Sequence, residues 1–201
     1  MSSHLTEYQR NCDWARGLSA LYSTLRPRVT SVLDLSDILR ASYVFSVSAF
    51  DAFVHDLVLV GMGEMFEGMR RKTDSFRHQR RNAADKFGVS RSQLSKEQFL
   101  FYVRERNALI SFQSIRNIAN AVRSIKTTEV WKAVAMKRCI PENTLTGQFE
   151  VIIQRRNIIV HQADTMPVLA GVRNPIDVKQ VQAGYDCLVV LAEDINFVSA
   201  A

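Results

Sequence analysis

The chain has 201 residues, of which 47% are hydrophobic, and this is enough for one globular domain with a buried core. Its net charge of +6 favours a polyanionic partner, although a basic surface that only keeps the protein soluble would give the same charge. The three cysteines, Cys12, Cys139 and Cys187, are odd in number and far apart, which excludes a disulfide framework and a zinc knuckle. Residues 1–16 do not resemble a signal peptide, so we expect a protein of the reducing cytoplasm.

Two helices are predicted in the first third of the chain. The first covers about residues 4–23, where apolar side chains repeat at steps of three and four. The second covers about residues 37–62 and is apolar almost all round, which is typical of a central, buried helix. Because Asp51, His55 and Asp56 interrupt its apolar run, we expect a core helix and no membrane span.

Asp51 and His55 stand four residues apart on this second helix and therefore face the same side. Such a pair could chelate a metal, but we favour a hydrogen bond that ties two buried polar groups together. The four histidines of the chain are scattered, so we expect neither a metal site nor a cofactor.

Residues 64–110 differ from the rest of the chain in charge. They hold eleven Lys and Arg against six Asp and Glu, and so carry five of the six net positive charges. Short helices at about residues 74–86 and 95–107 make this stretch a basic helical insertion between core helices. It could be a solvated helical face, or a track for the phosphate backbone of RNA, because phosphate contacts position a nucleic acid without reading its sequence. The cations expected to bind RNA are Arg70, Arg71, Lys72, Arg77, Arg80 and Arg81.

Four further helices complete the prediction, at about residues 114–125, 129–137, 144–163 and 174–198. The last has a strong start signal, with Asn174 as N-cap, Pro175 in the first turn and the acid Asp177 after it. No segment shows the alternation of polar and apolar residues that a strand requires. The sequence therefore predicts an all-α protein.

Residues 154–161, with the sequence QRRNIIVH, are the stretch whose side chains are best suited to catalysis. It places a permanent cation, an amide and an imidazole within about two helical turns, inside an otherwise apolar run. Arg forks onto phosphate oxygens, and His titrates near neutral pH. Together they suit phosphoryl chemistry without a metal.

Helical geometry predicts how these side chains meet. At about 100° per residue, Gln154, Asn157, His161 and Asp164 share one stripe of the helix. The Arg156 side chain starts on a different side but is long enough to curl back toward this stripe. Asn157 lies one turn below His161, where it could fix the orientation of the imidazole ring.

Arg156-Asn157-x-x-x-His161 resembles the Arg-x(4–6)-His motif of the HEPN domains, including the polar residue that usually follows the Arg. Two more stretches resemble the HEPN branch that is found beside RNA ligase and phosphoesterase genes. AFDAFVHD at residues 49–56 is similar to the early core helix of that branch, and RNPID at residues 173–177 is similar to the start of its last helix. The resemblance covers roughly residues 35–198.

This resemblance implies an up-and-down helical bundle that forms a dimer. Residues 1–201 would be a single HEPN-like domain, with a core of about residues 35–62 and 113–198 and the basic helical insertion at about residues 64–110.

The resemblance also implies roles for individual residues, because HEPN ribonucleases cut RNA without a metal. His161 would take the proton of a ribose 2′-hydroxyl or give one to the leaving 5′-oxygen, while Arg156 holds the scissile phosphate. Asn157 would orient the imidazole or contact the phosphate. Asp51 is the acid that HEPN helices often offer to the site, and Arg155 is an alternative to Arg156. One His cannot be base and acid in the same step, so two motifs would share one cleft in the dimer.

Two hypotheses for the function remain open. The first is a metal-independent endoribonuclease that leaves 2′,3′-cyclic phosphate and 5′-hydroxyl ends, acting as a toxin or in defence, with an antitoxin or operon partner. The second is a non-catalytic HEPN module that binds a nucleotide, RNA or a protein partner. A helical DNA-binding repressor would need residues 74–86 as its recognition helix. No Gly-rich phosphate loop, zinc-protease motif or nucleophile elbow occurs in the sequence.

Overall fold

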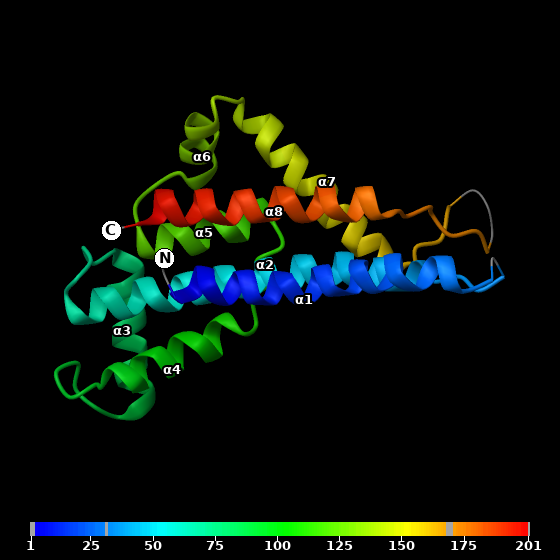
Figure 1. Ribbon diagram of the computed structural model, residues 1–201. Helices are drawn as coiled ribbons and strands as arrows, with labels where there is room; N and C mark the ends of the chain where they lie inside the picture. The colour runs from blue at the N-terminus through cyan, green and yellow to red at the C-terminus, as the bar shows by residue number, and fades with distance from the viewer. Residues whose placement is uncertain (1–2, 31, 168–170, 201) are drawn as a thin grey trace. The chain divides into compact units, whose positions relative to one another are not determined.

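The computed structural model describes residues 3–30, 32–167 and 171–200, and within them it is all-α without a strand, as predicted. Only one isolated antiparallel bridge, Thr165 to Arg173, is present in this part of the chain. The helices drawn in Figure 1 are α1 Ser3–Leu25, α2 Ser36–Glu67, α3 Asp74–Phe87, α4 Lys96–Asn107, α5 Ile115–Ile125, α6 Val130–Arg138, α7 Glu142–His161 and α8 Val178–Ser199, and a short 3-10 turn, η1 Arg26–Arg28, follows α1.

Capping residues explain why several helices begin where they do. The hydroxyl of Thr73 accepts a hydrogen bond from the backbone N–H of Phe76 at the start of α3. Ser95 and Gln98 form a capping box at the start of α4, in which each side chain accepts a bond from the other's backbone N–H. Both starts agree with the sequence prediction to within a residue.

The predicted start of the last helix is wrong. Helix α8 begins at Val178, and the carboxylate of Asp177 caps it by accepting the Gln180 N–H at 2.8 Å. Asn174 does not act as the N-cap, because its side-chain amide donates to the backbone oxygen of Asp164 at 3.0 Å. A tertiary contact therefore overrides the local Asn-Pro signal.

The chain divides into two compact units. Unit 1 comprises residues 1–50 and 146–193, and unit 2 comprises residues 51–145 and 194–201. The divisions fall inside α2, α7 and α8, so these three helices contribute to both units.

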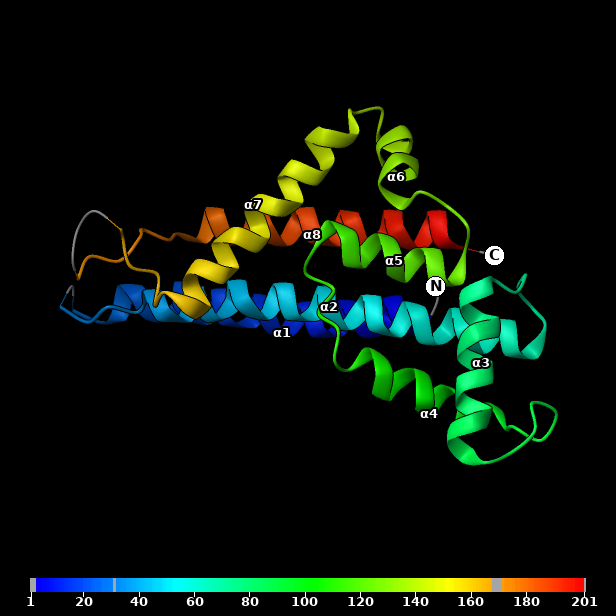
Figure 2. The ribbon, with the colours of Figure 1, turned by 180° about the vertical axis from the view of Figure 1, so that it is seen from behind.

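Unit 1 is built from α1, the first half of α2, most of α7 and most of α8. Helices α1 and α2 run side by side there (Figures 1 and 2), and the hydroxyl of Ser42 donates to the backbone oxygen of Ala15 at 2.6 Å. Phe50 connects three of the helices, because its ring lies 6.5 Å from the ring of Tyr8 and 5.6 Å from that of Phe149. These contacts fix α7, which carries the Arg/His motif, against the core of the unit.

Unit 2 contains α3 to α6 with the second half of α2 and the end of α8. Rings of Phe66, Phe76 and Phe99 form its aromatic core, with centroids 5.2 and 5.5 Å apart. Gly61 lets α2 approach α5 closely, since a Cβ at that position would lie 2.8 Å from a side-chain atom of Ile125. The basic residues of the insertion thus stand on a packed helical framework.

Helix α2 is also long and apolar enough to cross a membrane by length and composition, and half of its most apolar window is buried inside the protein. The core helix of a soluble protein meets the same criterion, so this property does not distinguish the two settings.

Candidate functional site

Helix α7 has one buried face and one exposed polar face. Phe149, Ile152 and Ile153 are buried in the core of unit 1, whereas Asn157 and His161 are exposed to solvent. An amphipathic helix of this kind presents its polar side chains to any ligand that reaches the surface.

The structure brings Arg156 and Asn157 into direct contact. Nη1 of Arg156 donates a hydrogen bond of 3.1 Å to Oδ1 of Asn157. The Nε atom of Arg156 is buried and has no hydrogen-bond partner among the described residues. Contact with a neighbouring amide restricts the guanidinium, and the remaining N–H groups of its two terminal nitrogens are the ones that could donate to an anion.

His161 is the last residue of α7, and its side chain is exposed. Within the described part of the chain, its imidazole makes no hydrogen bond or ion pair, and the side chain of Asn157 instead accepts from Arg156. The ring is therefore available to a ligand without first breaking an interaction.

Arg155 has a different role from its neighbour. Both terminal nitrogens of its guanidinium donate hydrogen bonds to the carboxylate of Asp164, and Nη2 lies 3.0 Å from Oδ2. Nη2 also donates to the backbone oxygen of Pro175 at 3.1 Å. Because these bonds use both terminal nitrogens of Arg155, its side chain would have to break them to bind a phosphate. Of the two arginines that the sequence leaves as alternatives, Arg156 is the one free to hold a phosphate.

Asp164 is the centre of a buried ion cluster behind the motif. Its side chain is 0% exposed, and besides Arg155 it accepts a bond of 2.6 Å from Nε of Arg40 on α2. The amide of Asn174 donates to it at 3.2 Å, and the backbone oxygen of Asn174 accepts from Arg40 at 2.8 Å. The cluster ties α2, α7 and the segment before α8 together.

The predicted stripe that extends from His161 to Asp164 is wrong. Helix α7 ends at His161, and the next residues reverse the chain, with φ of 48° at Ala163 and 60° at Asp164. Positive φ is unfavourable for a residue with a Cβ, although Asp tolerates it better than Ala. The reversal turns the Asp164 carboxylate inward, away from the solvent that reaches His161.

Asp51 lies in unit 2, where Oδ1 accepts the backbone N–H of Phe112 at 2.5 Å. Its other oxygen is 3.8 Å from Nε2 of His55, which is too long for the predicted hydrogen bond. The His55 ring packs on the ring of Phe112 instead, with centroids 4.5 Å apart. Among the described residues, no group of three or more His, Cys, Asp or Glu side chains could hold a metal ion.

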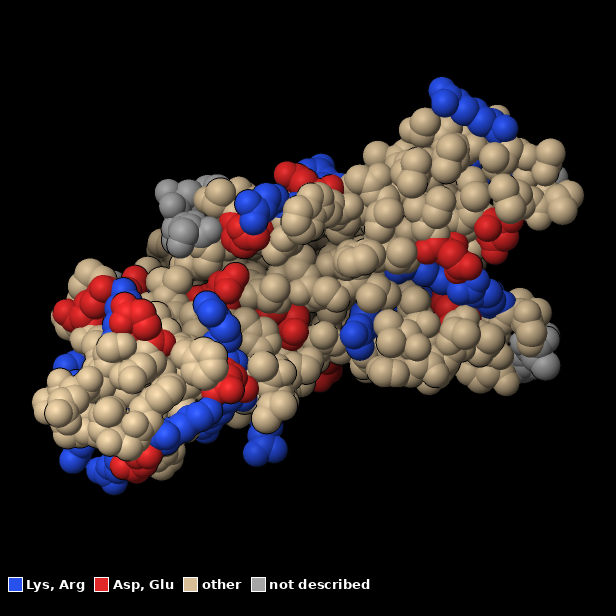
Figure 3. Space-filling model, turned by 90° about the horizontal axis from the view of Figure 1, so that it is seen from below, with Lys and Arg blue, Asp and Glu red and all other residues tan. Residues whose placement is uncertain are grey.

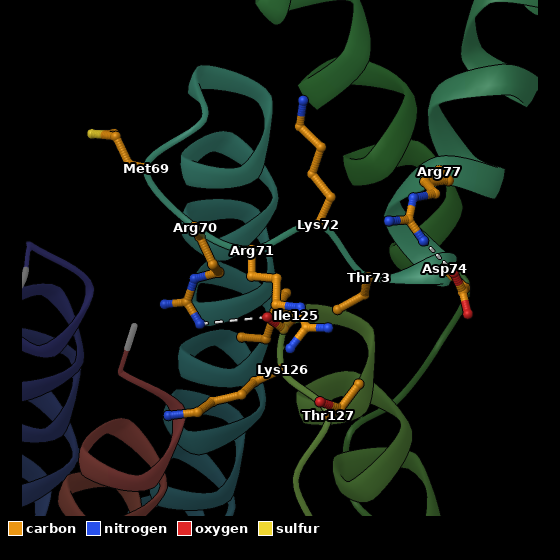
Figure 4. A pocket seen from close by; sticks show the side chains of 10 residues that line it. All are labelled: Met69, Arg70, Arg71, Lys72, Thr73, Asp74, Arg77, Ile125, Lys126 and Thr127. Carbon is orange, nitrogen blue, oxygen red and sulfur yellow. Dashed lines mark hydrogen bonds and ion pairs between the residues drawn. The ribbon is translucent and has the colours of Figure 1, made fainter.

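The six cations expected to bind RNA separate into two groups. Arg80 donates to the backbone oxygen of Arg91 at 2.8 Å and lies 5.1 Å from the centroid of the Phe66 ring, and Arg81 is exposed on α3. The others line one cavity of about 480 Å³ in unit 2 (Figure 4), where they are Arg70, Arg71, Lys72 and Arg77.

Lys126 also lines this cavity, and sequence reasoning missed it. It follows α5, 49 residues after Arg77, the nearest of the other cations in sequence, so no local pattern could have connected them. The loop before α3 and the loop after α5 meet only in the folded unit.

On the face that Figure 3 shows, the basic insertion does not form a continuous basic surface. Its Lys and Arg side chains lie there among Asp and Glu. Several of these charges pair with one another, as do Lys86 with Glu105 and Lys96 with Glu67.

A comparison of the sequence with models of protein families shows which family the chain belongs to. The model of RiboL-PSP-HEPN matches residues 15–196, which include the motif on α7. The chain belongs to the RiboL-PSP-HEPN family. HEPN domains are generally nucleases or nucleotide-binding modules. No curated protein and no solved structure matches the chain.

Proposed function

We propose that this HEPN protein is a metal-independent endoribonuclease whose reactive groups are Arg156 and His161, with Asn157 in support. The observation that carries the proposal is the exposed end of α7. There an imidazole that has no partner among the described residues follows a guanidinium that is hydrogen-bonded to an amide. The buried partners of Arg155 support the choice of Arg156 as the motif arginine.

In the proposed reaction, a ribose 2′-oxygen attacks the adjacent phosphorus and the bond from phosphorus to the 5′-oxygen breaks. One His161 accepts the proton of the 2′-hydroxyl, and a second His161 donates a proton to the leaving 5′-oxygen. Arg156 offsets the negative charge that builds up on the phosphate oxygens, because its guanidinium keeps its charge at any working pH. The products are a 2′,3′-cyclic phosphate and a 5′-hydroxyl.

Two imidazoles are needed in one step, so the proposal includes a dimer with two-fold symmetry. Each subunit would contribute its Arg156 and His161 to a common groove. Sedimentation of the wild type and of the His161→Ala variant should then give the same dimer, because His161 makes no intramolecular bond with a described residue.

The test is an incubation of single-stranded RNA with the purified protein in EDTA. We expect the wild type to cut the RNA, and we expect Arg156→Ala and His161→Ala each to lower the rate by about 100-fold or more. The matched controls are His78→Ala and Arg116→Ala, which remove an exposed imidazole and an exposed guanidinium elsewhere. Both controls should cut at the wild-type rate.

Intact RNA after incubation with a folded wild-type dimer would contradict the nuclease proposal. Binding of the same RNA without cleavage would then favour the second hypothesis, a HEPN module that binds RNA, a nucleotide or a protein partner without catalysis.

The biological role proposed for the activity is that of a toxin or a defence protein, with an antitoxin or other operon partner. Controlled expression in a bacterial host tests this role, since the wild type should arrest growth and His161→Ala should not. Normal growth with active wild-type protein present would contradict it.

A further inference from the structure

The cavity in unit 2 has the composition of an anion-binding pocket. It is formed by residues 69–74 and Arg77 on one side and by residues 125–127 on the other. In Figure 4, Arg71 reaches toward the loop that follows α5 and Arg77 lies on the opposite side of the cavity from Arg70, while the Lys72 and Lys126 side chains extend outward from its rim. Five cations and one carboxylate, that of Asp74, therefore line about 480 Å³.

Two of the five cations are neutralised within the protein. Arg77 pairs with Asp74 at 2.5 Å, and Arg70 pairs with Glu64 at 2.8 Å. Arg70 also donates to the backbone oxygen of Ser199 at 2.7 Å, and its side chain is only 9% exposed. Arg70 is thus a fixed part of the wall.

The other three cations pair with no carboxylate of the residues that the structure describes. Arg71 makes no ion pair or hydrogen bond within the described part of the chain, and Lys72 only lies 5.9 Å from the centroid of the Phe76 ring. Lys126 donates to the backbone oxygen of Ala200, which carries no formal charge. The lining of the pocket therefore carries an excess of about three positive charges, counted over its described residues.

A terminal phosphate matches this excess better than a phosphate within a strand. A phosphomonoester carries a charge of about −1.5 to −2 near neutral pH and offers three acceptor oxygens. A backbone phosphodiester carries only one charge, and some cations of α3 and α4 are already paired with carboxylates, as are Lys86 with Glu105 and Lys96 with Glu67.

We propose that this pocket binds a terminal phosphate group of the RNA substrate, so that the protein holds a strand by its end as well as by the cleaved linkage. The proposal rests on RNA being the substrate. The same chemistry is present on a free nucleotide, and the experiment separates the two sources.

The experiment measures binding by fluorescence anisotropy with full-length protein carrying His161→Ala, so that the RNA stays intact. Three versions of one internally labelled single-stranded RNA are compared: with a 5′-phosphate, with a 3′-phosphate and with hydroxyls at both ends. We expect one phosphorylated version to bind about tenfold more tightly than the hydroxyl version, the gain typical of charge-assisted hydrogen bonds. A nucleoside monophosphate is added as competitor. If it displaces the phosphorylated RNA at equal concentration, the pocket binds terminal phosphates from free nucleotides as well.

Three further variants connect the preference to the pocket. Arg71→Gln with Lys72→Gln should abolish the preference for the phosphorylated end, and so should Lys126→Gln tested separately. The matched control, Arg116→Gln with Lys132→Gln, removes the same two charges from exposed sites on α5 and α6 and should keep the preference. Circular dichroism checks that each variant is folded.

Equal affinity for phosphorylated and unphosphorylated RNA would overturn the proposal, as would a preference that survives in both folded pocket variants. The nuclease proposal fails independently, through intact RNA with the wild type. A terminal-phosphate preference in a protein that does not cut RNA would leave the pocket assignment standing and remove only the nuclease.

Discussion

The buried ion cluster behind the motif allows a quantitative prediction for Asp164→Asn. Asp164 is 0% exposed and the Arg40 side chain only 5% exposed, so the substitution leaves two guanidinium groups facing an amide in a site with little water. Removing one partner of a buried pair typically costs about 3 to 5 kcal/mol of unfolding free energy. Because the Asn carbonyl still accepts one bond, we expect a loss of about 3 kcal/mol.

A loss of this size is large compared with the total stability of about 5–15 kcal/mol that is usual for a domain. For a chain of this length it should lower the Tm by about 6–12 °C. Urea denaturation followed by circular dichroism measures the free energy, and a thermal scan measures the Tm.

Asp37→Asn is the matched control for this substitution. Asp37 also faces Arg40, at 3.5 Å, but its side chain is 67% exposed, so the loss should be below about 1 kcal/mol. If Asp164→Asn were no more destabilising than Asp37→Asn, the cluster would not hold α2, α7 and the segment before α8 together.

Three further predictions concern packing and ionisation. Gly61→Ala should lower the free energy of unfolding by about 1–3 kcal/mol, because the added Cβ would overlap the Ile125 side chain. Gly17→Ala should raise it by about 0.5–1 kcal/mol, because a Cβ there would have no atom within 4 Å and Ala favours the helix more than Gly does. Urea denaturation measures both variants, and equal effects would contradict the packing argument. Burial raises the pKa of the Cys12 thiol to about 11 from its ordinary 9.0, so the protonated thiol stabilises the folded state fully below pH 9, and this stabilisation is lost as the pH rises to 11. The free energy of unfolding should therefore fall less steeply between pH 9 and pH 11 in Cys12→Ala than in the wild type. An equally steep fall in both proteins would contradict this prediction. In native protein at pH 8, a thiol reagent should modify Cys139, which is exposed, before Cys12, which is buried. Peptide mass spectrometry identifies the labelled cysteine, and early labelling of Cys12 would show that α1 is not packed as described.

The helical elements could be predicted from the sequence because their signals are local. Apolar periodicity and short caps, such as Ser95 with Gln98, lie within one or two turns of the helix that they define. The family resemblance was confirmed for the same reason, since the motif on α7 is a contiguous stretch that can be recognised without the fold.

The features that were missed depend on residues far apart in the chain. The local sequence predicts Asn174 as a helix cap, but in the structure its side-chain amide donates to the backbone oxygen of Asp164. The chain reversal after His161 brings Asp164 to that position. The sequence favours Arg156 over Arg155 because Asn157 directly follows it, but only the structure shows that Arg155 is already paired with the buried Asp164 carboxylate. Lys126 joins the basic cavity through a loop contact that no spacing rule encodes.

The central claim is that Arg156 and His161 cleave RNA through its own 2′-hydroxyl without a metal. The most direct measurement compares a short single-stranded RNA with the same sequence carrying 2′-O-methyl riboses, both incubated with wild-type protein in EDTA, with mass spectrometry of the product ends. We predict that only the unmodified RNA is cut, and that its fragments carry 2′,3′-cyclic phosphate and 5′-hydroxyl ends. Cleavage of the 2′-O-methyl strand, or fragments that end in a 3′-hydroxyl, would contradict the account.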